Sequence, residues 1–155
     1  MLRSKGLVIL CHCVINQNSV VKPLARAKGS FIFVKQLIDE GLGIIQLPCP
    51  EFRHLGINRK PMEKEEYDTQ EYRSLCKDLA ITAAEDIEAY LKEGYDIKGI
   101  VGIKESPTCS ISGKRGIFME ELYDELGSRN IQLGYVEVPA DYSEEEALME
   151  LLWEK

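Results

Sequence analysis

The chain has little of what two large protein classes require. It carries 19 Lys and Arg against 26 Asp and Glu, a net charge of −7, whereas nucleic-acid binding requires a basic surface. It also has no uninterrupted apolar stretch of the length, about 20 residues, that a membrane-spanning helix needs. We therefore expect neither a nucleic acid nor a membrane among its partners.

Histidine and paired cysteines are also scarce. The sequence has only two histidines and five cysteines, with no CxxC pair of the kind found in structural zinc ribbons. An odd number of cysteines is typical of a reducing compartment, where thiols serve metals or catalysis rather than disulfides. Polar residues and cysteines interrupt the N-terminal apolar run too early for a secretory signal. We predict a cytoplasmic protein.

The overall composition, 45% apolar and 29% charged residues, is typical of a globular protein, and the length suits one domain over residues 1–155. Short runs rich in Val, Ile and Leu predict four strands. These are Leu7–Leu10, Gly43–Leu47, Lys98–Ile103 and Gln132–Val138. Three of them are nearly continuous rather than alternating, as in strands that are buried on both faces of a parallel sheet.

Helical patterns separate these strands along the chain. They cover residues 30–41, 69–93, 117–128 and 143–155, with capping or stop residues at several ends. Alternating strands and helices predict an α/β fold. We expect a three-layer sandwich of the Rossmann or flavodoxin-like type, with about four parallel strands and helices on both faces. The polar segment 56–70 is predicted to be a surface loop.

Four of the five cysteines directly follow predicted strands. Cys11 and Cys13 follow the first strand, Cys49 follows the second, and Cys109 follows the third. The strands of a parallel sheet all end at one edge, where open α/β folds bind their ligands. We therefore expect these thiols to converge on one site. The fifth cysteine, Cys76, lies within a helical pattern and is expected to be a buried apolar residue.

Prolines flank the cysteines that follow the second and third strands. Pro48 and Pro50 bracket Cys49, and Pro107 lies shortly before Cys109. Each proline fixes its own φ and restricts the residue before it, so we expect these thiols on stiff turns. A metal site requires ligands that the backbone holds in advance.

Several thiolates with few histidines favour an iron–sulfur cluster or zinc. Cys11 and Cys13 stand one residue apart, so in an extended segment their side chains point to opposite faces and only one of them reaches a shared centre. The sequence therefore predicts three cysteine ligands and one open coordination position. An open position indicates chemistry rather than a structural role.

Polar residues beside the cysteines complete the candidate site. Glu51 has the chemistry of a general acid or base, with a helix cap or a solvated carboxylate as the alternative. Ser106 is a candidate for positioning a ligand, with a cap for the turn at Pro107 as the alternative. Asn16 and Lys104 are candidates for substrate contacts, although Lys104 also fits a plain surface charge.

Both histidines are candidates for proton transfer or metal ligation. In an extended chain His12 points away from Cys11 and Cys13, which favours a histidine packed in the protein. His54 lies in what reads as a polar loop, where the side chain is expected to be solvated.

The same residues carry a resemblance to a known family. A strand that ends in Cys13, the motif CPE at Cys49–Glu51 and the motif SPTC at Ser106–Cys109 resemble the 2-thiouracil desulfidase family. The resemblance is closer to its desulfidase-related branch, formerly a domain of unknown function. The order and spacing of the three elements cover most of the chain.

The resemblance implies an enzyme in which Cys13, Cys49 and Cys109 hold a 4Fe–4S cluster, with Cys11 as an alternate ligand. The iron without a protein ligand would bind the sulfur of a small thiolated substrate, such as a thiolated nucleobase. Water would then replace that sulfur, which would leave as hydrosulfide. Glu51 and Ser106 match motif positions that serve proton transfer and substrate positioning.

The loops around these motifs depart from the family pattern. VINQNSVV stands where the family has a glycine-containing turn and an RYDG-like segment, FRHLGINRKP differs after CPE, and Ser110 replaces a glycine. Because such loops contact the substrate, the resemblance implies the cluster chemistry and leaves the substrate open.

Three alternative functions stay open. The first is a zinc-binding enzyme or domain, the second is a non-catalytic redox sensor or sulfur carrier, and the third is a small-molecule-binding module with incidental cysteines. The sequence does not determine the oligomeric state, and a homodimer stays open.

Overall fold

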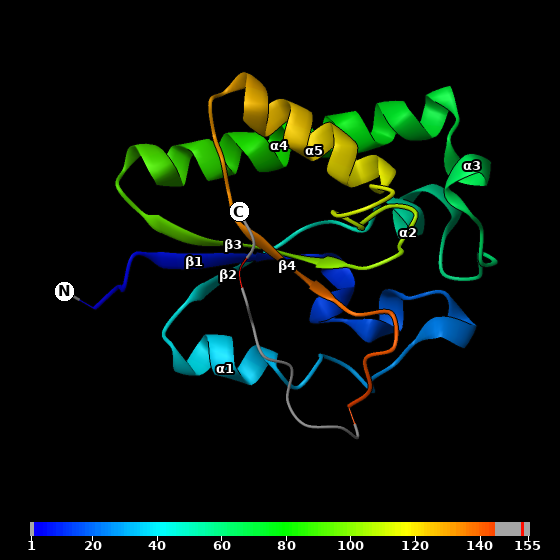
Figure 1. Cartoon of the computed structure of the whole chain (residues 1–155), viewed down its shortest axis with the longest axis horizontal. Coiled ribbons are helices and arrows are strands. Elements are labelled where there is room, and N and C mark those ends of the chain that lie inside the picture. Colours follow the sequence, from blue (N-terminus) through cyan, green and yellow to red (C-terminus); the bar gives the residue numbers. More distant parts are fainter. Residues whose placement is uncertain (1, 145–152, 154–155) are drawn as a thin grey trace.

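Four parallel strands form one sheet in the computed structural model of the chain (Figure 1). They are β1 (Gly6–Leu10), β2 (Gly43–Gln46), β3 (Asp96–Ile103) and β4 (Tyr135–Val138). Their order, β2–β1–β3–β4, is that of the first four strands of a flavodoxin-like sheet. The structure describes residues 2–144 and Trp153, so the predicted C-terminal helix lies almost entirely outside them.

The central strands are buried because they consist largely of Val, Ile and Leu. In β1, the side chains of Val8, Ile9 and Leu10 have no exposed surface, and the same holds for Ile100 and Val101 in β3. The outer strand β2 is half-buried or exposed along its length. This is the burial expected when both faces of a parallel sheet are covered.

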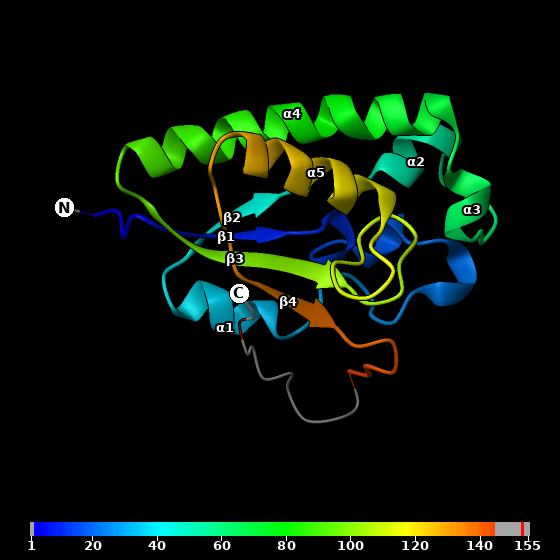
Figure 2. The same cartoon turned by 45° about the horizontal axis from the view of Figure 1, so that its top comes forward.

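Helices cover both faces of the sheet (Figures 1 and 2). Helices α4 (Gln70–Lys92) and α5 (Ile117–Ser128) lie together on one face, and α1 (Val34–Asp39) lies on the other. The short helices α2 (Pro50–Leu55) and α3 (Lys64–Tyr67) lie near the carboxyl ends of the strands. This arrangement is the three-layer α/β sandwich of the Rossmann or flavodoxin-like type that the sequence predicts, so the fold class is confirmed.

The long helix α4 begins where the sequence predicts. The side-chain oxygen of Thr69 accepts a hydrogen bond from the N–H of Tyr72 at 3.1 Å and so caps the first turn. Cys76 has no exposed surface, which confirms its prediction as a buried residue. Within the described part of the chain, neither α4 nor any other helix has the length and apolar character needed to cross a membrane.

Two elements begin three or more residues later than predicted. The first helix begins at Val34 rather than at Ser30, because the rings of Phe31 and Phe33 are buried in the core and the chain enters the helix through a turn. The last strand begins at Tyr135, later than predicted. Tertiary contacts decide both positions, and local propensity does not encode them.

The prediction of a surface loop over residues 56–70 is wrong in part. Helix α3 occupies the middle of this segment and begins with a capping box, in which Glu66 accepts a hydrogen bond from the N–H of Glu63 at 3.1 Å. Arg59 and Tyr67 are buried. Their burial depends on a partner outside the segment, the carboxylate described in the next subsection.

A β-bulge adjusts the pairing of β3 with β1. The register shifts between Leu7 and Ile9, where β3 contains one extra residue. Gly99 lies in this bulge with φ of +151°. A Cβ at Gly99 would lie 2.5 Å from the carbonyl oxygen of Gly134. Both the backbone conformation and the available space therefore require glycine.

Gly99→Ala is expected to lower the free energy of unfolding by about 2–3 kcal/mol, because backbone strain and steric contact both oppose the added carbon. Urea denaturation followed by circular dichroism measures the change. Gly127→Ala in α5 is the matched control, since nothing lies within 4 Å of its Cβ position. The control should keep its stability or gain up to about 1 kcal/mol. Equal losses in the two variants would contradict the assigned role of Gly99.

Candidate functional site

The carboxyl ends of the strands surround a cavity of about 350 Å³. Cys13, Cys49 and Cys109 line it, and each follows a different strand of the sheet. The structure thus brings together three thiols that lie far apart in the sequence, as strand polarity requires. Cys11 does not line the cavity. The ligand role of these residues stays a prediction.

A tight turn after β1 presents Cys13 to the cavity. His12–Val14 form a 3₁₀ turn, so the extended geometry assumed for this segment is wrong. The turn separates the two neighbouring thiols, because Cys11 is fully buried while Cys13 lines the cavity. The buried side chain of Gln17 holds the turn. Its Nε2 donates to the carbonyl oxygen of Cys13 at 2.9 Å, and its Oε1 accepts from the N–H of Arg26 at 2.8 Å.

Cys49 is the N-terminal capping residue of α2. Its Sγ accepts a hydrogen bond from the N–H of Phe52 at 3.4 Å, and Pro50 occupies the first helical position, where its fixed φ suits a helix. Glu51 follows in the first turn and also lines the cavity. The motif CPE therefore places a thiol and a carboxylate side by side at the start of a helix.

Ser106 shapes the turn that carries Cys109. Its Oγ accepts hydrogen bonds from the N–H groups of Thr108 at 3.2 Å and of Cys109 at 2.9 Å, so its alternative reading as a turn cap is confirmed. Neither bond uses the hydroxyl proton of Ser106, and this side chain also lines the cavity. Ser106 therefore keeps a donor that a ligand can use.

Two glycines allow the Cys109 turn to pack against the end of β3. A Cβ on Gly116 would lie 2.3 Å from the carbonyl carbon of Thr108, and a Cβ on Gly102 would lie 2.8 Å from the carbonyl oxygen of Cys109. Both distances are shorter than real contacts allow. The N–H of Ile103 donates to the same carbonyl oxygen of Cys109 at 3.1 Å. The backbone thus fixes the position of this thiol.

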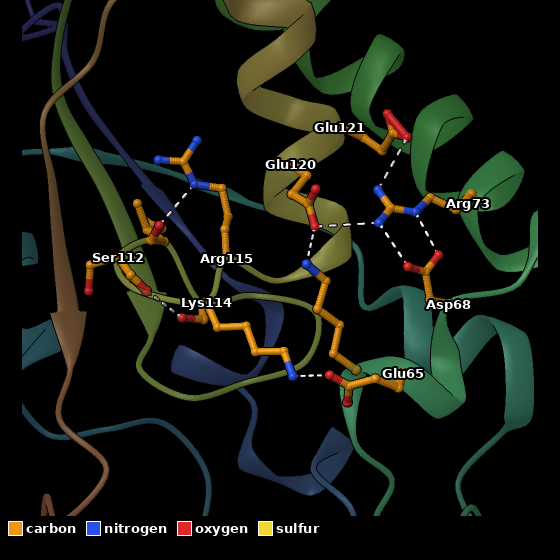
Figure 3. Close-up of polar contacts among 11 residues, drawn as sticks. Glu65, Asp68, Arg73, Ser112, Lys114, Arg115, Glu120 and Glu121 are labelled. Carbon is orange, nitrogen blue, oxygen red and sulfur yellow. Dashed lines mark hydrogen bonds and ion pairs between the residues drawn. The ribbon is translucent and has the colours of Figure 1, made fainter.

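Ion pairs connect the loop that follows Cys109 with the surrounding helices (Figure 3). Lys114 of this loop pairs with Glu65 of α3. Arg73 of α4 donates to Asp68 at 2.9 Å and to Glu120 of α5 at 3.4 Å. These side chains are partly or largely exposed, so water and salt screen the pairs and each adds little to the stability of the fold. Together they join three helices to the loop.

Glu51 is the centre of a side-chain network beside the cavity. Its Oε2 accepts a hydrogen bond from Oγ1 of Thr108 at 2.7 Å. Its Oε1 accepts from the hydroxyl of Tyr67 at 3.2 Å and from Nε of Arg59 at 3.3 Å. The hydroxyl of Tyr72 lies 2.7 Å from Oγ1 of Thr108. Because Thr108 gives its only proton to Glu51, Tyr72 must donate to Thr108.

This network is shielded from water. The side chain of Arg59 is 3% exposed and that of Glu51 is 15% exposed, while Thr108 and Tyr72 are buried. Arg59 also donates to the carbonyl oxygen of Ser19 at 2.8 Å. Buried charges persist in proteins only when partners of this kind compensate the lost hydration. The carboxylate is therefore held in one position.

Burial raises the pKa of the thiols that line the cavity. The pKa of Cys49 rises to about 11, and the pKa of Cys13 also rises, with the charges of Cys109 and Cys49 as further causes. A hydrogen bond with Cys11, followed by burial, raises the pKa of Cys109. The three thiols are therefore protonated at neutral pH in the metal-free chain. Because metal binding must displace these protons, the affinity for a metal is expected to rise with pH.

The candidate substrate residues differ in position. Lys104 is exposed and lines the cavity. Asn16 does not line it, because its Oδ1 accepts a hydrogen bond from the N–H of Asn18 at 3.2 Å and caps the 3₁₀ turn Gln17–Ser19. Asn16 therefore has a structural role in this loop.

Neither histidine lines the cavity. The Nδ1 atom of His12 lies 3.2 Å from the carbonyl oxygen of Leu47, which agrees with a packed histidine. The placement of His54 in a solvated loop is wrong. It lies in α2, half-buried, with its ring centroid 5.0 Å from that of Tyr72. The cap at Cys49 starts a helix that local polarity did not indicate.

Sequence reasoning missed four residues that hold the site together. They are Gln17, Arg59, Tyr67 and Thr108. The available signal for Thr108 was its place within SPTC. No local pattern marks Arg59 or Tyr67 as buried, because both lie in a strongly polar segment.

The donor set of the cavity suits a cofactor that prefers thiolates. Cys13, Cys49 and Cys109 supply three sulfur donors, the ligand type that iron–sulfur clusters take. Within residues 2–144 and 153, no group of three or more His, Cys, Asp or Glu side chains is arranged to hold a single metal ion. Three thiols that line one cavity suit a polynuclear cluster, whose cysteines bind different iron atoms.

Thr108→Val is expected to lower the free energy of unfolding by about 1–3 kcal/mol, because it leaves the buried hydroxyl of Tyr72 and an oxygen of Glu51 without their partner. Thr108→Ser keeps the hydroxyl and serves as the control. Urea denaturation compares the two variants. If the valine variant is as stable as the serine variant or more stable, the hydroxyl of Thr108 does not stabilise the site.

Comparison with known proteins reveals a relative that matches along nearly the whole chain. The chain is 45% identical over 139 residues to the uncharacterized protein MJ0003 of Methanocaldococcus jannaschii, a match that covers 89% of this chain and 88% of the relative. No protein-family profile matches the chain, and no solved structure gives a significant match. The chain therefore belongs to the family of the Methanocaldococcus jannaschii protein MJ0003.

Proposed function

We propose that this protein is an iron–sulfur-dependent desulfidase, an enzyme that removes sulfur from a small thiolated compound. The observation that carries the proposal is the gathering of Cys13, Cys49 and Cys109 around one cavity that a fixed carboxylate, Glu51, also lines. The same residues carry the resemblance to the 2-thiouracil desulfidase family. The reaction converts a thiocarbonyl group and water into a carbonyl group and hydrogen sulfide.

In this proposal Cys13, Cys49 and Cys109 hold a 4Fe–4S cluster and leave one iron without a protein ligand. When bound, such a cluster supplies Lewis acidity toward the sulfur of the substrate. The stiff turns at Pro50 and Ser106 hold two of the thiols in advance. This advance placement is what a cofactor site needs. Zinc on the same thiols is the alternative.

Glu51 is suited to moving a proton. A carboxylate offers about four acceptor positions, and Arg59, Tyr67 and Thr108 occupy three of them. The remaining position, on Oε2, can take a proton from a water molecule while the oxygen of that water attacks the thiocarbonyl carbon. The two donors to Oε1, together with Thr108 at Oε2, keep the carboxylate from rotating and hold Oε2 in one orientation.

The cavity wall offers an apolar surface to a substrate, together with a few polar groups. Its apolar residues are Val20, Val21, Leu24, Ile103, Pro107 and Ala140. The hydroxyl proton of Ser106 and the ammonium group of Lys104 are available to polar atoms of a ligand. A flat thiolated base or a thioamide suits a site of this composition. We place the protein in the cytoplasm, where thiols stay reduced.

Cys13→Ser, Cys49→Ser and Cys109→Ser are each expected to abolish cluster binding, whereas the control Cys76→Ser should keep it, because Cys76 lies in the core away from the cavity. Iron and acid-labile sulfide are measured after anaerobic reconstitution. Normal contents in all three single variants would refute the ligand assignment. Zinc in place of iron and sulfide in anaerobically purified protein would favour the zinc alternative.

Glu51→Gln is expected to keep the iron content and to slow sulfide release by about 10²- to 10⁴-fold, the usual contribution of a general acid or base. The assay screens thiolated bases and thioamides under anaerobic conditions. Glu85→Gln on the exposed side of α4 is the control for the loss of one negative charge. Equal rates in both variants would remove Glu51 from the mechanism. A fully loaded protein that releases no sulfide from any of these compounds would contradict the desulfidase function.

A further inference from the structure

One cysteine at the sheet edge has no part in the proposed function. Cys11 follows the last residue of β1, and its N–H extends the pairing with β3 by donating to the carbonyl oxygen of Val101 at 3.1 Å. Its side chain has no exposed surface and does not line the cavity. A fully buried thiol at this position either packs as an unreactive apolar side chain or interacts with another functional group inside the protein.

The turn of Cys109 packs onto the same point of the sheet. Val101 is followed by Gly102, and a Cβ on Gly102 would lie 2.8 Å from the carbonyl oxygen of Cys109. That oxygen accepts a hydrogen bond from the N–H of Ile103 at 3.1 Å. The missing side chain therefore gives Cys109 room beside the end of β1. Because Leu10 pairs with Val101, Cys11 lies beside Gly102, on which the Cys109 turn packs, and the nearness of Cys11 is the first cause that raises the pKa of the Cys109 thiol.

We propose that Cys11 and Cys109 form a redox-active pair, in which Cys109 reacts with small-molecule disulfides and Cys11 resolves the product into an intramolecular disulfide. Cys109 is half-buried and lines the cavity, so a small disulfide can reach it. Cys11 is fully buried, so it reacts only with a neighbour inside the protein. An accessible thiol beside a buried resolving thiol allows the two steps of thiol–disulfide exchange to follow each other within one chain.

The exchange is balanced in two steps. The sulfur of Cys109 attacks one sulfur of the small disulfide, forms a mixed disulfide and releases one molecule of small thiol, which takes up a proton. The sulfur of Cys11 then attacks the Cys109 sulfur of the mixed disulfide and releases the second small thiol. The two cysteines lose two electrons and two protons in total, and the small disulfide is reduced to two thiols.

The other thiols at the cavity are less suited to pair with Cys109. Cys11 is the first cause of the raised pKa of the Cys109 thiol, and neither Cys13 nor Cys49 is among its causes. The Sγ of Cys49 is occupied by the N–H of Phe52. Its position beside the Cys109 turn therefore makes Cys11 the expected partner of Cys109.

The test uses the metal-free, reduced chain and bis(2-hydroxyethyl) disulfide without oxygen, followed by mass spectrometry of tryptic peptides under non-reducing conditions. The expected product lacks two hydrogens, carries no adduct and links the peptide of Cys109 to residues 6–26. Trypsin leaves Cys11 and Cys13 together on that peptide, so variants must assign the bond. Cys13→Ala should still form the link, whereas Cys11→Ala should retain the mixed disulfide on Cys109. Cys76→Ala is the control and should behave as the unchanged chain.

A stable adduct on the unchanged chain, or a link from Cys109 to Cys13 or Cys49, would overturn the proposal. Circular dichroism checks the folding of Cys11→Ala. Should this variant fail to fold, fragmentation of the linked peptide between Cys11 and Cys13 in the unchanged chain assigns the bond. Cys13 as the linked residue in that spectrum would also overturn the proposal.

One consequence rests on the proposed function. A disulfide at Cys109 removes one of the three cluster ligands, so the oxidised chain should take up little or no iron until a reductant is added. Iron uptake after reductant treatment measures this loss and its recovery. Because the disulfide map itself needs no iron, the two ideas can fail separately. A mapped disulfide with unchanged iron uptake would count against Cys109 as a ligand and not against the pair.

Discussion

The hydrogen bond from Thr108 to Glu51 joins two loops that strand pairing alone does not connect. Glu51 follows β2 and Thr108 follows β3, and β1 lies between these strands in the sheet. Parallel pairing brings the loops to one edge but does not set the distance between them. A shielded bond of 2.7 Å sets it. Because Cys49 and Cys109 adjoin the two ends of this bond in the sequence, the same bond positions two of the cavity thiols.

The candidate site depends on polar groups more than on apolar packing. A carboxylate that is withdrawn from water needs donors, and those of Glu51 come from a strand-end loop and from a segment that folds back to reach it. One such donor, Arg59, in turn binds the loop after β1 through Ser19. In the proposed function this rigidity places a base beside three thiols. Cys109 then has two proposed roles, as a ligand of the cluster and as the disulfide partner of Cys11. Its single sulfur cannot fill both roles at once.

Particular residues show how far the sequence could predict this site. Cys49 and Cys109 were predictable, because each follows a continuous apolar run and parallel strands end at one edge. The turn cap at Ser106 was predictable from its place before Pro107. The inward position of Arg59 was not, since a charged residue in a polar segment is normally solvated. The separation of Cys11 from Cys13 was assigned to an extended chain, whereas a 3₁₀ turn produces it.

The sequence by itself determined the fold class, the edge of the sheet where the cysteines gather and the buried state of Cys76, because these follow from local periodicity and chain direction. Only the tertiary structure decided which donors surround Glu51 and which thiol lies beside Cys109. These arrangements depend on contacts between residues that are distant along the chain. Such contacts are fixed by space and by the need to satisfy buried polar groups, and neither leaves a periodic mark in the sequence.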